Sequence, residues 1–124
     1  MKDGKYVILC VDDDQDLLDS LRVILEGEDY VMEEAGSAEE GLRKYKATDP
    51  DLVIVDLMME EVDAGTNLVR QMKAMGATPP VYMLSSVGDT LSISADTSEL
   101  GLTGVLQKPI NPKTLVSTLK TKLK

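Results

Sequence analysis

The chain has 124 residues, of which 43% are hydrophobic and 28% charged, and its formal net charge is -9 at pH 7. This length suits one domain that buries roughly two-thirds of its unfolded surface, so we expect residues 1–124 to form a single domain. The acidic balance argues against nucleic-acid binding, which needs clustered Lys and Arg. Histidine is absent, and this excludes Ser-His and Cys-His nucleophile pairs and His-ligated zinc sites.

Membrane spans and secretion signals are not visible in the sequence. No apolar run approaches membrane-spanning length, and the polar start over residues 1–5 does not resemble a signal peptide. The single cysteine, Cys10, cannot form an internal disulfide and is expected to be a small buried hydrophobe. We therefore expect a cytoplasmic protein with no membrane partner.

In the first half of the chain, apolar runs alternate with segments of helical periodicity. Two strand–helix units and a third strand are predicted, and Gly27 stops the first helix. Ser37 and Glu40 form a capping box that opens the second helix. The strands are residues 6–11, 30–35 and 52–55, and the apolar helix positions are Leu17, Leu18, Leu21, Ile24 and Leu25, then Ala38, Leu42 and Tyr45.

The second half continues the alternation but contains one weak segment. Gly76 closes a third helix, and Asn111 with Pro112 opens the last helix as N-cap and first helical residue. Residues 87–103 are rich in Ser, Thr and Gly, so we expect a long loop with a short helix over 96–100. The strands are residues 81–84 and 104–107, and the apolar helix positions are Leu68, Val69, Met72 and Met75, then Leu115, Val116, Leu119 and Leu123.

This alternation predicts an α/β fold. Repeated strand–helix units favour a parallel sheet with right-handed crossovers and helices on both faces. The C-terminal ends of all strands then share one edge, where ligands of open α/β sheets bind. Four of the strands run into polar residues, namely Asp12, Asp13 and Asp14, then Asp56, then Ser85 and Ser86, then Lys108-Pro109. We therefore predict that carboxylates, a hydroxyl and an ammonium converge there.

These residue types suit phosphoryl transfer with a divalent cation. Two unit charges about 4 Å apart interact by roughly 4 kcal/mol at an effective dielectric of 20, which here is repulsive. Mg²⁺ relieves such repulsion among Asp12, Asp13 and Asp56, because it binds a few carboxylates and keeps waters and phosphate oxygens. Asp56 is the candidate nucleophile, which would form an acyl phosphate while Lys108 and Ser85 stabilise charge on the transferring oxygens.

The acidic run has simpler interpretations for some of its members. Asp14 and Asp16 are better explained as N-cap candidates of the helix that follows. The run also resembles the start of a calcium loop, but Leu17 stands where that loop needs Gly and Val23 where it needs Glu. A Gly-rich phosphate loop ending in Gly-Lys-Ser or Gly-Lys-Thr is absent.

Taken together, the motifs resemble the receiver domain of two-component response regulators over nearly the whole chain. The matching segments are ILCVDDD near the start, VIVDLMM at mid-chain, YMLSS at the fourth strand and LQKPI at the fifth. The resemblance implies a doubly wound, flavodoxin-like (βα)5 fold with strand order 2-1-3-4-5. It also implies a cis Lys108–Pro109 bond.

The same resemblance implies a phosphorylation-dependent signalling switch that controls a protein partner. Asp56 would accept a phosphoryl group from a sensor histidine kinase or a histidine phosphotransfer protein. The domain would not be an enzyme with a separate substrate, and would catalyse only its own phosphoryl uptake and slow autodephosphorylation. The implied Mg²⁺ ligands are Asp12, Asp13, Asp56 and the backbone carbonyl of Met58, and the implied contacts to phosphoryl oxygens come from Ser85 and Lys108.

Departures from the family pattern concern output rather than the phosphorylation site. Val105 stands where the family usually has Tyr or Phe, and the chain contains no Phe or Trp. Met58 is apolar at a position that tunes dephosphorylation in the family, Glu60 replaces a frequent Pro, and Ala64 resembles a one-residue insertion. We therefore expect phosphorylation to shift the conformation of residues 85–105 without an aromatic switch.

Two other functions stay open at this point. A pseudo-receiver would be a binding module of the same fold with a silent site, and the intact set of site residues argues against it. A phosphohydrolase would use Asp12 and Asp14 as nucleophile and acid, but no insertion that would bind a substrate is visible. The simplest expectation is a stand-alone regulator that acts by protein contact, although a fragment of a longer regulator would have the same sequence.

Overall fold

A computed structural model describes residues 4–56, 64–76, 79–85, 103–108 and 110–123, with only the backbone of residues 64–66 and 85. Within these ranges, five strands alternate with helices along the chain. The elements are β1 (Val7–Val11), α1 (Gln15–Gly27), β2 (Val31–Ala35), α2 (Ala38–Thr48), β3 (Leu52–Asp56), α3 (Ala64–Ala74), β4 (Val81–Ser85), β5 (Gly104–Gln107) and α5 (Pro112–Lys122).

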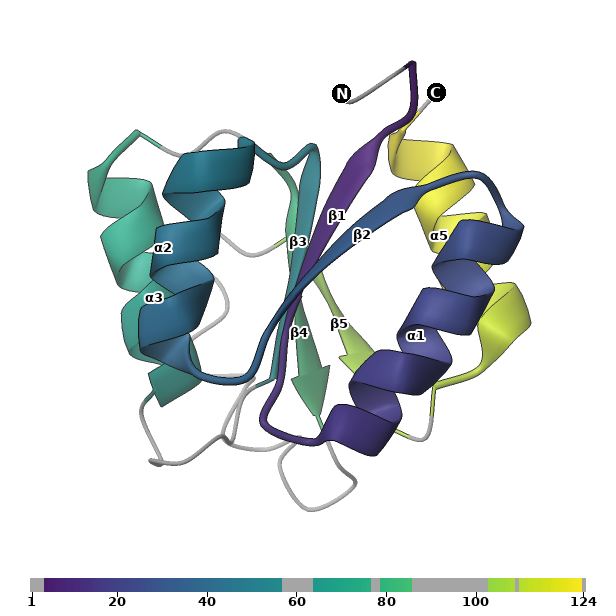
Figure 1. The fold of residues 1–124 in the computed structure, drawn as a ribbon, viewed down its shortest axis with the longest axis horizontal. Coiled ribbons are helices and arrows are strands. Elements are labelled where there is room, and N and C mark those ends of the chain that lie inside the picture. Colours follow the sequence, from purple (N-terminus) through teal and green to yellow (C-terminus); the bar gives the residue numbers. More distant parts are fainter. Residues whose placement is uncertain (1–3, 57–63, 77–78, 86–102, 109, 124) are drawn as a thin grey trace.

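The strands form one sheet, all parallel, in the order β2-β1-β3-β4-β5. Helices α1 and α5 cover one face of this sheet, and α2 and α3 cover the other (Figure 1). The predicted fold class and strand order are therefore confirmed. The short helix predicted over 96–100, and nearly all of the loop predicted around it, lie outside the described residues.

Two buried clusters, one on each face of the sheet, form the core. Along β1, Ile8 and Cys10 point into the cluster beneath α1 and α5, while Leu9 and Val11 point into the cluster beneath α2 and α3. Every residue of β1 is buried, as expected for a central strand covered on both faces. This explains why the strand reads as an uninterrupted apolar run.

Most helix positions follow the predicted faces, but Val116 of α5, predicted to face the core, is only half-buried and is not among the residues packed against it. In α1, Leu18, Leu21 and Leu25 are buried. Met75, predicted on the apolar face of α3, is 45% exposed, so that prediction is wrong. Met75 lies just beyond the last residue of the helix, Ala74. The next residue, Gly76, has a φ of 81° and turns the chain away, so Met75 does not pack on the core.

The helix caps also follow the sequence, with two corrections. The Asp14 carboxylate accepts hydrogen bonds from the backbone N–H groups of Asp16 and Leu17, so Asp14 caps α1 and Asp16 lies in its first turn. Ser37 caps α2 as predicted. Glu40, however, accepts from Gly36 N at 2.8 Å rather than from the cap residue itself.

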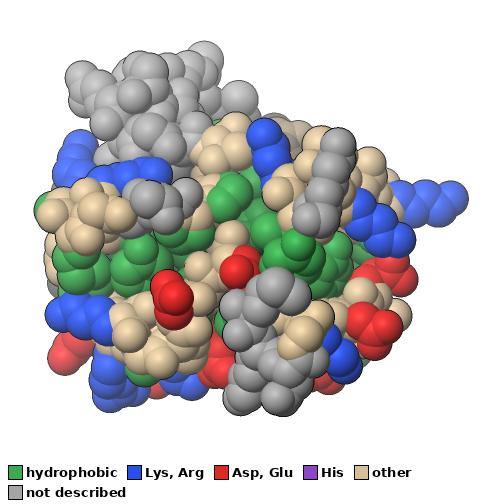
Figure 2. All heavy atoms as spheres, turned by 90° about the horizontal axis from the view of Figure 1, so that it is seen from above, with side chains coloured by type: hydrophobic (Ala, Val, Ile, Leu, Met, Phe, Trp, Pro, Cys, Tyr) green, Lys and Arg blue, Asp and Glu red, His purple; other side chains and the backbone are tan. Residues whose placement is uncertain are grey.

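The face seen from above in Figure 1, at the N-terminal ends of the strands, shows hydrophobic side chains between charged ones (Figure 2). Among the described residues, the group of carboxylates close enough to share one cation lies at the opposite edge of the sheet.

No helix in the described part of the chain reaches the length and hydropathy that crossing a membrane requires.

Gly41 sets the distance between α2 and the sheet. A Cβ atom built there would lie 2.9 Å from Cγ2 of Val11 and 3.0 Å from Cδ2 of Leu68. The Gly41→Ala variant should therefore lose about 1–2 kcal/mol of unfolding free energy, because overpacking outweighs the gain in helix propensity. Gly27→Ala is the control, since its Cβ meets nothing within 4 Å and should leave stability equal or slightly higher in urea unfolding.

Candidate functional site

The parallel register brings the predicted polar residues to one edge of the sheet, the lower edge in Figure 1. Val11 pairs with Val55, so the residues that follow them, Asp12 and Asp56, emerge from neighbouring strands at the same level. Lys108 follows the last residue of β5. Asp12, in the loop after β1, and Asp56, at the end of β3, therefore lie at the same edge as Lys108, which follows β5.

A cluster of three carboxylates occupies this edge. One oxygen each from Asp12, Asp13 and Asp56 lie within 4.8 Å of one another. Asp12 is 0% exposed and Asp56 is 4% exposed, whereas Asp13 is exposed. Two of the three charges are therefore held out of water, where their repulsion is least screened.

Lys108 partly neutralises this cluster. Its Nζ lies 3.2 Å from Asp12 Oδ2 and 3.3 Å from Asp56 Oδ1, and 24% of its side chain is exposed. Burial by itself would lower the pKa of Lys108, but the charges of Asp12 and then Asp56 outweigh it and raise that pKa above its ordinary value. The ammonium therefore stays protonated at neutral pH.

The cluster suits a divalent cation. Asp12 Oδ1 accepts a hydrogen bond from Asp14 N at 2.9 Å. Asp12 Oδ2 is buried and has no well-aligned hydrogen-bond partner among the described residues, although Lys108 lies within ion-pair distance. Three carboxylates with one ammonium leave an excess of negative charge, and oxygen ligands of this kind bind hard cations such as Mg²⁺.

Other predicted residues are not part of the cluster or lie outside the described residues. Asp14 caps α1 and is not among the clustered carboxylates, which removes support for an Asp12–Asp14 pair of a phosphohydrolase. Ser85 ends β4 and pairs with Gln107, one residue before Lys108, but its side chain is not described. Met58 and the Lys108–Pro109 bond fall outside the described residues.

Comparison with known proteins places the chain in a family. The sequence model of the response regulator receiver domain matches residues 8–120, and the chain belongs to that family. It is therefore the receiver domain of a response regulator of two-component signalling.

Particular relatives agree with this assignment. The DNA-binding response regulator MtrA of Mycobacterium tuberculosis is 32% identical over 117 residues, covering 94% of this chain and 50% of its own. The transcriptional regulatory protein ResD of Bacillus subtilis is 33% identical, with coverage of 94% and 48%. The chain thus spans about half the length of the curated relatives it matches.

Solved structures give the same result. The chemotaxis protein CheY4 of Vibrio cholerae superposes with a TM-score of 0.87 at 28% identity, covering 97% of this chain and 100% of its own. A response regulator described as putative, from Chloroflexus aurantiacus, has a TM-score of 0.86 at 31% identity, with coverage of 97% and 98%.

Proposed function

We propose that this receiver domain accepts a phosphoryl group on Asp56 from the phosphohistidine of a sensor histidine kinase or a histidine phosphotransfer protein, and that uptake requires Mg²⁺. The observation that carries the proposal is the position of the Asp56 carboxylate. It is almost fully buried, 3.3 Å from the Lys108 ammonium, and clustered with Asp12 and Asp13.

The residues divide the chemistry between them. A carboxylate oxygen of Asp56 attacks phosphorus, the new O–P bond forms as the P–N bond of the donor breaks, and the imidazole leaves. Lys108, protonated because its pKa is raised, pairs with a phosphoryl oxygen in place of part of its present contact with Asp56. The Ser85 hydroxyl contacts another phosphoryl oxygen.

Mg²⁺ would be held by Asp12, Asp13, Asp56 and the backbone carbonyl of Met58. When bound, it supplies positive charge to the oxygens of the transferring group. The clustering of three carboxylates supports this assignment, because oxygen ligands of this kind bind hard divalent cations. The domain then acts on itself only, through phosphoryl uptake and slow autodephosphorylation, and is not an enzyme with a separate substrate.

Output would pass to a protein partner through residues 85–105. Val105 is 38% exposed on β5, where the family usually has an aromatic residue, so the signal would not depend on an aromatic rotamer. MtrA is named a DNA-binding regulator. The net charge of -9 argues that the present domain does not itself bind nucleic acid.

Intact-mass spectrometry tests the proposal. With acetyl phosphate and Mg²⁺, the chain should gain one phosphoryl group, and neither the Asp56→Asn variant nor the wild type in EDTA should gain any. Asp14→Asn is the matched control, because Asn still caps α1 and the variant should be phosphorylated like the wild type. A wild type that gains no mass under these conditions would instead be a pseudo-receiver.

A further inference from the structure

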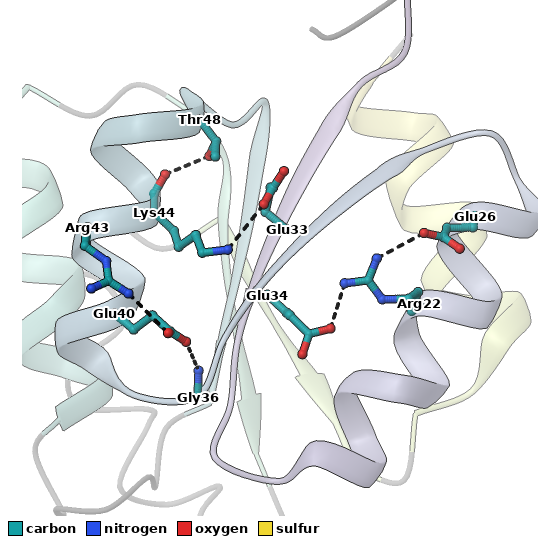
Figure 3. A network of polar contacts seen from close by, with 9 residues as sticks. All are labelled: Arg22, Glu26, Glu33, Glu34, Gly36, Glu40, Arg43, Lys44 and Thr48. Atoms are coloured by element: carbon teal, nitrogen blue, oxygen red, sulfur yellow. Dashed lines mark hydrogen bonds and ion pairs between the residues drawn. The ribbon is translucent and has the colours of Figure 1, made fainter.

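Two adjacent glutamates on the edge strand β2 point to opposite faces of the sheet (Figure 3). Glu33 reaches α2, where its Oε1 lies 3.5 Å from Lys44 Nζ. Glu34 reaches α1 on the other face. Because successive strand residues alternate in direction, the two carboxylates serve different helices, and only Glu34 faces the helix that follows the acidic loop of residues 12–14.

Both oxygens of Glu34 are occupied. Arg22 donates from Nη2 to Oε1 at 2.6 Å, and Gln15 donates from Nε2 to Oε2 at 3.0 Å. Arg22 also pairs with Glu26 at 3.0 Å, which fixes its own position along α1. The hydrogen bonds from Arg22 and then from Gln15 lower the pKa of Glu34, so the carboxylate is ionised at neutral pH.

The acidic loop is consequently held to β2 at both of its ends. At one end, Asp12 N donates to the Ala35 carbonyl at 3.0 Å. At the other end, Gln15 is the first residue of α1, and its Nε2 donates to Glu34 on β2 and, within α1, to Asp19 at 2.9 Å. Asp13 lies between these two points and is the exposed member of the carboxylate cluster.

We propose that Glu34 is a positioning residue for the cation site. Through Gln15 it holds the start of α1 against the end of β2, and this keeps Asp13 within reach of Asp12 and Asp56. The inference rests on the proposed Mg²⁺ site. The loss of such a hydrogen bond leaves the ligands in place but less ordered, so a cation must order them on binding and its affinity falls.

Isothermal titration with Mg²⁺ on proteins shown to be folded by circular dichroism tests this role. Glu34→Ala should weaken Mg²⁺ binding about tenfold, at the lower end of the effect of outer-shell partners. Gln15→Ala should do the same, and the double variant should bind Mg²⁺ no more weakly than either single variant, because each substitution removes the same Gln15–Glu34 hydrogen bond. Glu33→Ala, on the same strand, is the matched control and should bind Mg²⁺ like the wild type.

Phosphorylation with acetyl phosphate provides a readout that general destabilisation would not reproduce. The rate of Glu34→Ala should fall at low Mg²⁺ and return to the wild-type rate at saturating Mg²⁺. Equal Mg²⁺ affinity for Glu34→Ala and Glu33→Ala, or additive effects of Gln15→Ala and Glu34→Ala, would overturn the positioning role alone. If the wild type itself shows no Mg²⁺ affinity that depends on Asp13, the proposed function fails as well. Should Glu34→Ala not fold, Gln15→Ala decides the question.

Discussion

Without Mg²⁺, Asp56→Asn should unfold at a higher urea concentration than the wild type, with a gain of about 1–2 kcal/mol. At an effective dielectric of 20, each repulsion between carboxylates that lie within 4.8 Å of one another is at least about 3.5 kcal/mol, and the attraction to Lys108 at 3.3 Å is about 5 kcal/mol. Among the charges of the cluster and Lys108, loss of the Asp56 charge removes two repulsions and one attraction. Because Asp13 is exposed, solvent screens its repulsion with Asp56, and this keeps the net gain in unfolding free energy small.

Urea unfolding in EDTA, followed by circular dichroism, measures this gain. Asp16→Asn is the control, because Asp16 lies in the first turn of α1 outside the cluster. It should lose up to about 1 kcal/mol through the helix dipole, which is the opposite sign. If the wild type were more stable than Asp56→Asn in EDTA, this would contradict the view that repulsion among the clustered carboxylates destabilises the fold in the absence of a cation.

The Lys108→Met variant should lose about 3 kcal/mol of unfolding free energy in EDTA. Removal of one partner of a buried ion pair costs about 3–5 kcal/mol, and the lower value applies because 24% of the Lys108 side chain is exposed. Mg²⁺ at 100 times its Kd should return about 2.7 kcal/mol, since a bound cation replaces the lost positive charge. Failure of Mg²⁺ to restore stability would mean that Lys108 and the cation do not share the same carboxylates.

The pH dependence of this loss has a definite sign. The folded pKa of Lys108 is raised, so its contribution is complete below the unfolded value of about 10.4 and is lost as pH rises through the folded value. The difference between wild type and Lys108→Met should thus be constant from about pH 7 to about pH 9 and shrink only above about pH 10.5. Lys120→Met is the control: Lys120 is 63% exposed beside Glu28, and its loss should cost at most about 1 kcal/mol.

The fold was predictable because its signals are local and mutually consistent. The uninterrupted apolar run of β1, the cap residue Ser37 and the breaks between elements all point to a parallel sheet with helices on both faces. The convergence of Asp12, Asp56 and Lys108 was predictable for a related reason, since parallel strands share one C-terminal edge.

Other features depend on contacts that periodicity does not carry. Met75 has the right spacing for the face of α3, yet the helix stops one residue earlier, and the position of a helix end is set by the turn at Gly76. Nor does any motif connect Gln15 to Glu34. Their hydrogen bond joins residues 19 apart, and it follows from the pairing of β2 with β1 together with the direction in which α1 leaves the loop.

The thiol of Cys10 has a consequence for experiments on this molecule. It is 0% exposed in the central strand, and burial raises its pKa far above the ordinary value, so the native fold presents almost no reactive thiolate. Alkylating reagents can then modify only molecules in which β1 has separated from its neighbours. The chain therefore carries its own single-atom reporter of strand opening, two residues from Asp12, without an engineered label.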